Sequence, residues 1–348
     1  MTHIQQVLWS GFVIGLLFGA VAERSRYCTA GGLREWWRDR NPRRAAALLV
    51  ALAVAVSGTQ LLDAFGWVDL RSSLYLQSAF SWLLMPLGGV LFGYGMMLAR
   101  GCGSRTLVLL ASGNLRALIV LPALGIGAAV TLTGPLAPWR LALMEATSVT
   151  PPAPGVPDLL RLSAPGHVAA VTILVLGLLL IALIRLRLYR YPWDIAGAVL
   201  IGLLIPAGWL VTGHIGADDF EPVPVESLTF VAPIADSIHY LMLSTGIRAG
   251  FGVTVVAGVL VGALLAALAG RRFHWRSFDS PGHMLRSLGG GVMMGVGGAL
   301  ALGCTIGQGL TGLSTLSMPS GLAVIGILLG ARLAVIMHEA VVPGQPAA

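Results

Sequence analysis

This sequence of 348 residues contains nine long apolar runs, and short arginine-containing segments separate many of them. A helix needs about 20 predominantly apolar residues to cross the hydrocarbon core of a bilayer, and most of the runs approach that length. Only 11% of the residues are charged, whereas an ordinary soluble domain has about 25%, so a soluble enzyme, a disordered chain and a nucleic-acid-binding domain are excluded. The sequence therefore predicts an all-α polytopic membrane protein with about nine transmembrane helices. The predicted spans are Val7–Ala22, Ala45–Leu62, Ser81–Ala99, Ala117–Leu136, His167–Ile184, Asp194–Val211, Gly250–Ala269, Leu288–Leu302 and Pro319–His338.

The distribution of arginine predicts the orientation in the membrane. All 22 basic residues are Arg, and they gather after the first, fifth and seventh runs, whereas the segment 218–236 after the sixth run is acidic. Because basic residues accumulate on the cytoplasmic side, the N-terminus is expected outside and the C-terminus inside. We expect the chain to be a multi-pass protein of the bacterial inner membrane. The basic residues used for this prediction are Arg34, Arg38, Arg40, Arg43, Arg44, Arg185, Arg187, Arg190, Arg271, Arg272 and Arg276.

An internal repeat connects the two halves of the sequence. The Gly-rich segment 88–95, followed by Gly101-Cys102, matches the segment 290–297, followed by Gly303-Cys304, at a constant offset of 202 residues. The matching spans run in opposite directions in the predicted topology, so the repeat is inverted, as in many transporters. The predicted organisation is a single membrane domain, 1–348, with a first repeat over about 1–137, a connecting helix over about 166–190 and a second repeat over about 193–340.

Three cysteines lie in Gly-rich breaks of the apolar sequence, at Cys28, Cys102 and Cys304. Their odd number argues against a disulfide framework. After Cys102 and after Cys304, about ten residues precede the next Gly or Ser break. This length is too short to span a bilayer and predicts short re-entrant helices. The N-terminus of such a helix, capped by Ser104 or Thr305, offers unpaired N–H groups and a partial positive charge to an anion.

The chemistry of the thiol indicates the class of substrate. A neutral thiol is a weak donor and a soft acceptor, which suits a sulfur or selenium anion better than a hard oxyanion. Three thiols at successive levels predict a transport pathway without catalytic residues or a cofactor. No metal is expected, because metal ligands usually cluster, whereas these cysteines lie 74 and 202 residues apart. The candidate substrate-binding residues are Cys28, Cys102, Cys304, Gly101, Gly103, Ser104, Gly303, Thr305 and Arg105.

The Arg-Tyr-Cys-Thr-Ala-Gly-Gly segment around Cys28 and the repeated Gly-rich segments ending at Cys102 and Cys304 resemble the YeeE/YedE family of sulfur transporters. The resemblance covers nearly the whole chain, and studied members of the family take up thiosulfate. It implies an hourglass-shaped helical bundle in which thiosulfate passes along the three thiols through S–H···S contacts. It also implies a cytosolic TusA-like or rhodanese-like sulfurtransferase as a partner, in addition to membrane lipid. This chain departs from the pattern in lacking Lys and in its extended acidic segment, 218–236.

The predicted function is uptake of thiosulfate, or a closely related sulfur anion, into the cytoplasm, and the protein is not expected to be an enzyme. One alternative is transport of a selenium or persulfide compound, since other family members are linked to selenium. Another is a membrane sulfurtransferase or thiol oxidoreductase with Cys28 as nucleophile, although the sequence contains no CxxC motif. A soft-metal channel ranks third. Because no isolated carboxylate lies clearly within a predicted span, we expect a cytosolic acceptor to drive uptake.

Overall fold

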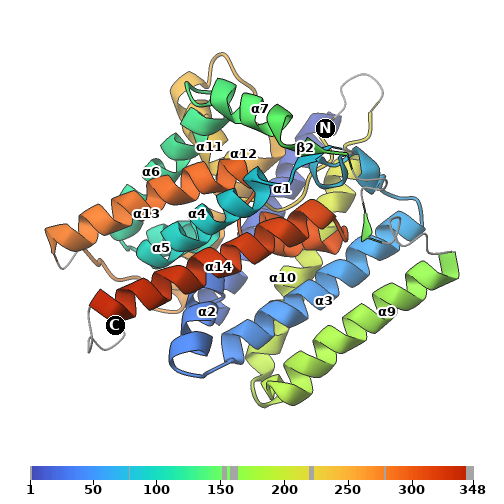
Figure 1. The fold of residues 1–348 in the computed structure, drawn as a ribbon, viewed down its shortest axis with the longest axis horizontal. Coiled ribbons are helices and arrows are strands. Elements are labelled where there is room, and N and C mark those ends of the chain that lie inside the picture. Colours follow the sequence, from blue (N-terminus) through green and yellow to red (C-terminus); the bar gives the residue numbers. More distant parts are fainter. Residues whose placement is uncertain are drawn as a thin grey trace.

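A computed structural model describes residues 2–77, 79–150, 155–156, 164–218, 223–277 and 280–341, which fold predominantly into helices (Figure 1). Each of the nine apolar runs coincides with a long helix. The long helices are α1 (His3–Ser25), α3 (Arg43–Ala64), α4 (Leu84–Leu98), α6 (Arg116–Leu132), α9 (Ala164–Leu180), α10 (Pro192–Leu210), α12 (Phe251–Ala269), α13 (Pro281–Leu300) and α14 (Met318–Val341). The shorter elements are α2 (Thr29–Arg38), α5 (Gly103–Ala111), α7 (Ala137–Ala146), α11 (Val231–Leu243), η1 (Leu70–Ser72), η2 (Leu74–Leu76), η3 (Ile181–Arg185), η4 (Leu188–Arg190), η5 (Val211–Ile215), η6 (Gly307–Gly312), and the antiparallel pair β1 (Phe80–Ser81) and β2 (Ser148–Val149).

Six helices in the described residues are long and apolar enough to cross a membrane, or up to seven if α6 and α7, bent by 59° at their junction, form one span. This number makes the chain a multi-pass membrane protein, but the nine predicted spans are not confirmed. Helix α4 has only 15 residues, and α13 begins with a polar turn that contains His283 and Arg286. Both helices lie inside the bundle, so neighbouring helices cover them along much of their length.

Glycines bring the central helices into close contact. Helices α4 and α13 cross where Gly88 meets the backbone of Gly297 and Gly95 meets the backbone of Gly290. Helix α14 covers the other side of α4, where a Cβ added at Gly93 would overlap the backbone carbonyl of Ile327. Small residues allow membrane helices to approach this closely. The high glycine content is therefore used for helix packing.

The helix contacts fall into corresponding pairs. Helix α1 packs on α12 and α10 packs on α3, while α4 packs on α14 and α13 packs on α6. Helix α9 lies at the edge of the molecule, where it packs against α3 (Figure 1). Most of its side chains, including Ile173 and Leu176, are exposed on the surface of the bundle. An apolar helix in this position is suited to contact with lipid.

Candidate functional site

Cys28 occupies the break between α1 and α2. Helix α1 ends where Arg26 adopts a left-handed conformation, with φ of 51°. Cys28 is then extended and serves as the N-cap of α2, and its Sγ accepts a hydrogen bond of 3.2 Å from the N–H of Gly31. A free first-turn N–H is thus satisfied by a thiol in place of the more usual hydroxyl or carboxylate. This cap fixes the thiol in a buried position between the two helices.

Cys102 occupies an equivalent break between α4 and α5. It is the N-cap of α5, and its Sγ lies 3.4 Å from the Oγ of Ser104. The expectation that Ser104 caps this helix is wrong, because α5 begins one residue earlier, at Gly103, and Ser104 lies in its first turn. The thiol and the hydroxyl therefore stand side by side at the start of a short helix. Both are buried.

Cys304 follows α13 in the same way, and η6 begins three residues later. Its Sγ accepts a hydrogen bond of 3.3 Å from the N–H of Gly307. The backbone N–H groups of Ile306 and Phe230 also lie near this sulfur. The Cys304 sulfur is therefore surrounded by backbone donors, which is the environment that a sulfur anion would need.

The breaks at Cys102 and Cys304 have the same backbone geometry. Arg100 and Leu302 both adopt left-handed conformations, with φ of 57° and 54°. After them, the N–H of Gly101 bonds to the carbonyl of Met96, and the N–H of Gly303 bonds to the carbonyl of Gly298. This is the Schellman pattern that commonly ends a helix, although glycine usually takes the left-handed position.

The glycines predicted to form the site have different surroundings. A Cβ added at Gly101 would lie 3.5 Å from its nearest neighbour, and one added at Gly103 would lie 3.4 Å from Ile234 and Leu124, which are ordinary contacts. A Cβ added at Gly303 would lie 3.1 Å from the Gln308 side chain. Of the three, only Gly303 is therefore held by tight packing.

The structure places Cys102 near both of the other thiols, and the three are called the thiol row below. Cys102 is close enough to interact electrostatically with both Cys28 and Cys304. The exposed fractions of Cys28, Cys102 and Cys304 are 8%, 1% and 1%. Among the described residues, no group of three His, Cys, Asp or Glu side chains is arranged to hold a metal ion.

Several buried polar atoms near the thiols have no hydrogen-bond partner in the described structure. Tyr27 lies close to both Cys28 and Cys102, and its Oη is one of these atoms. The others in this region are Thr305 Oγ1, Gln308 Oε1 and Ser320 Oγ. Because buried polar groups normally have partners, these atoms are free to bond water or a polar ligand. The sequence pointed to Thr305 but not to Tyr27 or Gln308. Tyr27 directly precedes Cys28, and Gln308 lies in the short segment after Cys304, so their position beside the cysteines is the signal that could have found them.

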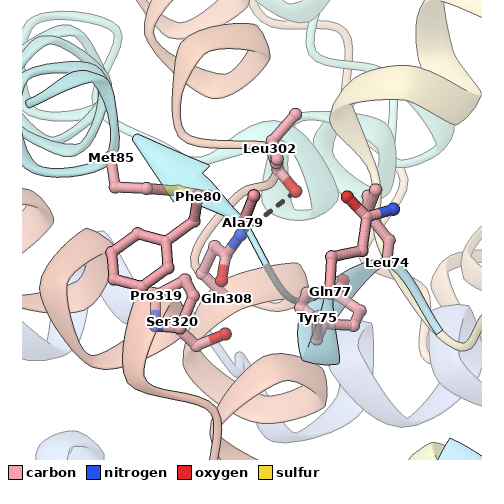
Figure 2. A pocket seen from close by; sticks show the side chains of 10 residues that line it. All are labelled: Leu74, Tyr75, Gln77, Ala79, Phe80, Met85, Leu302, Gln308, Pro319 and Ser320. Atoms are coloured by element: carbon pink, nitrogen blue, oxygen red, sulfur yellow. Dashed lines mark hydrogen bonds between the residues drawn. The ribbon is translucent and has the colours of Figure 1, made fainter. Parts of the chain in front are cut away.

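A small cavity lies beside Gln308 and Tyr75, near the Cys304 end of the thiol row, and Figure 2 shows the residues that line it. Gln308 and Ser320 line it, and Tyr75, which also lines it, is an electrostatic neighbour of Cys304. The amide nitrogen of Gln308 donates to the carbonyls of Ala301 and Leu302, so its Oε1 remains available (Figure 2). The cavity volume is about 20 Å³, which is room for about one water molecule.

Arginines surround the opposite end of the row, at Cys28. Arg105, Arg44 and Arg34 all interact electrostatically with this thiol. Arg105 belongs to α5, three residues after Cys102, but it reaches toward the end of α1, where it forms an ion pair of 3.6 Å with Glu23. The structure thus places the predicted site residue Arg105 at the Cys28 end, an arrangement that the sequence spacing did not indicate.

The segment between η5 and α11 also reaches the Cys304 end. Thr311 donates a hydrogen bond of 2.6 Å to the carbonyl of Leu228, and Phe230, two residues later, contacts the Cys304 sulfur. Glu226 lies just before, outside the candidate spans, and is an electrostatic neighbour of Tyr75. Burial, with a smaller contribution from the nearby carboxylate of Asp236, raises the pKa of Glu226 to about 7.

This arrangement is suited to holding a soft anion at several successive positions. Each position combines a thiol with a hydroxyl or with backbone N–H groups, and each lies at the start of a short helix or turn, where partial positive charge is available.

Comparisons with known proteins agree with this chemistry. A sequence model of a family described as sulphur transport matches residues 24–333. The thiosulfate transporter TsuA of Escherichia coli (strain K12) is 28% identical, over 93% of this chain and 92% of its own length. The protein of the same name from Spirochaeta thermophila is 27% identical, over 93% of this chain and 97% of its own. The probable transporter YedE of Escherichia coli is 29% identical over only 28% of this chain and 23% of its own length.

Proposed function

Because the chain belongs to the sulphur transport family, we propose that it carries thiosulfate, or a closely related sulfur anion, into the cell past Cys304, Cys102 and Cys28. The observation that carries this proposal is that Cys102 lies near both other buried thiols, with a small cavity near Cys304 and arginines near Cys28. The names of the relatives that span nearly the whole chain support thiosulfate as the substrate. The family match agrees with the resemblance found in the sequence.

The proposed path begins at the cavity beside Tyr75 and Gln308. The sulfane sulfur of thiosulfate accepts a hydrogen bond from the Cys304 thiol, while backbone N–H groups at the start of η6 offset part of the lost hydration. The anion then passes to Cys102 and Ser104, and finally to Cys28, where arginine side chains attract it. Since the cavity holds about one water molecule, the outer end has to widen before an anion enters.

We also propose the inverted repeat, with the N-terminus outside and the C-terminus inside the inner membrane. The paired helix contacts support the repeat, as do the matching left-handed residues Arg100 and Leu302, which are 202 positions apart. In the repeat, Gly88 corresponds to Gly290 and Gly95 corresponds to Gly297. The contact of Gly88 with Gly297 therefore corresponds to the contact of Gly290 with Gly95, and both occur where α4 crosses α13. Such a reciprocal contact is what a pseudo-two-fold axis produces.

Uptake of a dianion into a cell with an inside-negative membrane potential requires an energy source. Moving two negative charges inward against a potential of ~100 mV costs about 4.6 kcal/mol, and neutral thiols supply none of it. We propose that a cytosolic TusA-like or rhodanese-like sulfurtransferase consumes the product at the inner face. The arginine-rich surroundings of Cys28 suit the delivery of an anion to such an acceptor.

The direct test is uptake of labelled thiosulfate into proteoliposomes that contain the purified protein. We expect saturable uptake down a thiosulfate gradient, with little inhibition by excess sulfate, because sulfate has no sulfane sulfur for the thiols. Uptake no faster than into protein-free liposomes would contradict the proposed function. Accumulation against an inside-negative potential, in liposomes empty of any acceptor, would contradict capture as the sole source of drive.

Uptake is also expected to depend on external pH through Glu226. Below a pH of about 7 this carboxyl is neutral, and above it the carboxylate repels a dianion near Tyr75. The initial rate at low thiosulfate should therefore fall several-fold as the external pH rises from about 6 to about 8.

The variant Glu226→Gln should transport at a rate that hardly changes over this pH range. Asp236→Asn removes the second carboxylate near Glu226, so the fall in rate should move to lower pH. A wild-type pH profile in Glu226→Gln would contradict this role.

A further inference from the structure

Two of the arginines around Cys28 are already paired with glutamates. Arg105 lies 3.6 Å from Glu23, and Arg44 lies 2.9 Å from Glu35. Both guanidinium groups interact electrostatically with the Cys28 thiol. The innermost position of the proposed path is thus built from a thiol, arginine cations and carboxylates that share those cations.

The two ion pairs differ in burial. The side chains of Glu23 and Arg105 are 9% and 16% exposed, whereas those of Glu35 and Arg44 are 28% and 33% exposed. Charge interactions are stronger in the less solvated pair. Solvent therefore screens the Glu23–Arg105 pair less than the Glu35–Arg44 pair.

The geometry of the buried pair is loose. A charge-assisted hydrogen bond between a guanidinium and a carboxylate normally measures about 2.7–2.9 Å, whereas the Glu23–Arg105 distance is 3.6 Å. The same guanidinium donates a long hydrogen bond of 3.5 Å to the carbonyl of Ala22. Arg105 is thus held near Cys28 without being locked to one acceptor, which leaves its donors available for exchange.

A transport site has to bind its ion strongly enough to receive it and weakly enough to release it. An unpaired buried arginine beside Cys28 would satisfy the first requirement and fail the second, because a dianion would remain on it. A carboxylate that competes for the same guanidinium solves this problem.

We propose that Glu23 is the internal counter-anion of the Cys28 position and sets the rate at which the transported anion leaves. The carboxylate occupies Arg105 while the position is empty, gives way when the dianion arrives, and takes the guanidinium back as the anion departs. Glu23 is thus a positioning residue that acts through Arg105. This inference rests on the proposed function. It adds that the Glu23–Arg105 ion pair, and not the thiols alone, controls release of the anion.

The test is the kinetics of thiosulfate uptake by the Glu23→Gln variant in proteoliposomes. Glutamine keeps the size of the side chain and removes its charge, so Arg105 should hold the anion more tightly. We expect both KM and the maximal rate to fall, each by on the order of tenfold, the size of a typical coupling between sites. Asp194→Asn, which removes the carboxylate of the Arg43–Asp194 pair outside the Cys28 position, is the matched control and should change both values by less than about twofold.

The outcomes separate this inference from the proposed function. If the wild type shows no uptake, the function fails. If the wild type transports and Glu23→Gln keeps its KM or raises it, only the role of Glu23 is overturned. If Glu23→Gln does not fold because it leaves Arg105 buried and unpaired, the double variant Glu23→Gln/Arg105→Gln is tested instead, since it removes both charges of the pair. It should bind labelled thiosulfate more weakly than the wild type, and wild-type affinity in it would also overturn the inference.

Discussion

Replacing Cys304 by alanine is expected to reduce thiosulfate uptake to the level of protein-free liposomes, while the folded yield stays near that of the wild type. The Cys304 thiol is the first of the proposed path and stands among the N–H groups of Gly307, Ile306 and Phe230. Alanine removes the sulfur donor and leaves these backbone groups without the acceptor they surround. Labelled thiosulfate uptake measures the first effect, and size-exclusion chromatography in detergent measures the second.

Two variants make this result interpretable. Cys304→Ser keeps a donor at the same place but replaces soft sulfur by hard oxygen, so it should retain only part of the uptake. Thr172→Ala removes a hydroxyl from the exposed helix α9, where it bonds to the carbonyl of Val168, and should leave uptake unchanged. Near-normal uptake by Cys304→Ala would mean that the thiol serves packing alone.

The variant Gly93→Ala is expected to destabilise the whole bundle. The added Cβ would overlap the backbone carbonyl of Ile327, and in the same helix pair a Cβ at Gly330 would overlap that of Val90. A backbone carbonyl cannot rotate away, so α4 and α14 would have to separate. Overpacking of this kind costs about 1–3 kcal/mol. Thermal unfolding in detergent should therefore show a lower Tm, and the folded yield should fall with it.

Gly289→Ala is the matched control in α13. An added Cβ at this position has no neighbour within 4 Å, and alanine is the better helix former by about 1 kcal/mol. Its Tm should equal or exceed that of the wild type. If Gly93→Ala unfolds at the same temperature as Gly289→Ala, close approach of α4 and α14 does not limit stability.

The helices predicted from the sequence are confirmed, whereas the nine spans stay a prediction. Each apolar run became a helix, because apolar residues and short polar breaks are visible in the local sequence. Whether a helix meets lipid or protein depends on its neighbours. Helices α4 and α13 are short or partly polar and pack against neighbouring helices, so length and composition alone do not confirm them as spans.

The candidate site was also only partly visible in the sequence. Cys28, Cys102 and Cys304 stood out in the sequence because each interrupts an apolar run beside glycine. The partners of these residues did not stand out. The contact between Arg105 and the carbonyl of Ala22 joins positions 83 residues apart, and the contact between Thr311 and Leu228 spans the same separation. Such pairs follow from helix packing, which a single sequence does not display.

The sequence by itself determined that the chain is a membrane protein of many helices with three thiols at helix breaks, because composition, apolar length and breaks are local properties of the chain. Only the tertiary structure decided that Cys102 lies near both other thiols, that a small cavity lies beside Gln308 and Tyr75, and that Glu23 pairs with Arg105 near Cys28. These arrangements depend on contacts between distant helices. The physical reason is that burial and electrostatic coupling arise only when packing removes water between groups that the sequence keeps far apart.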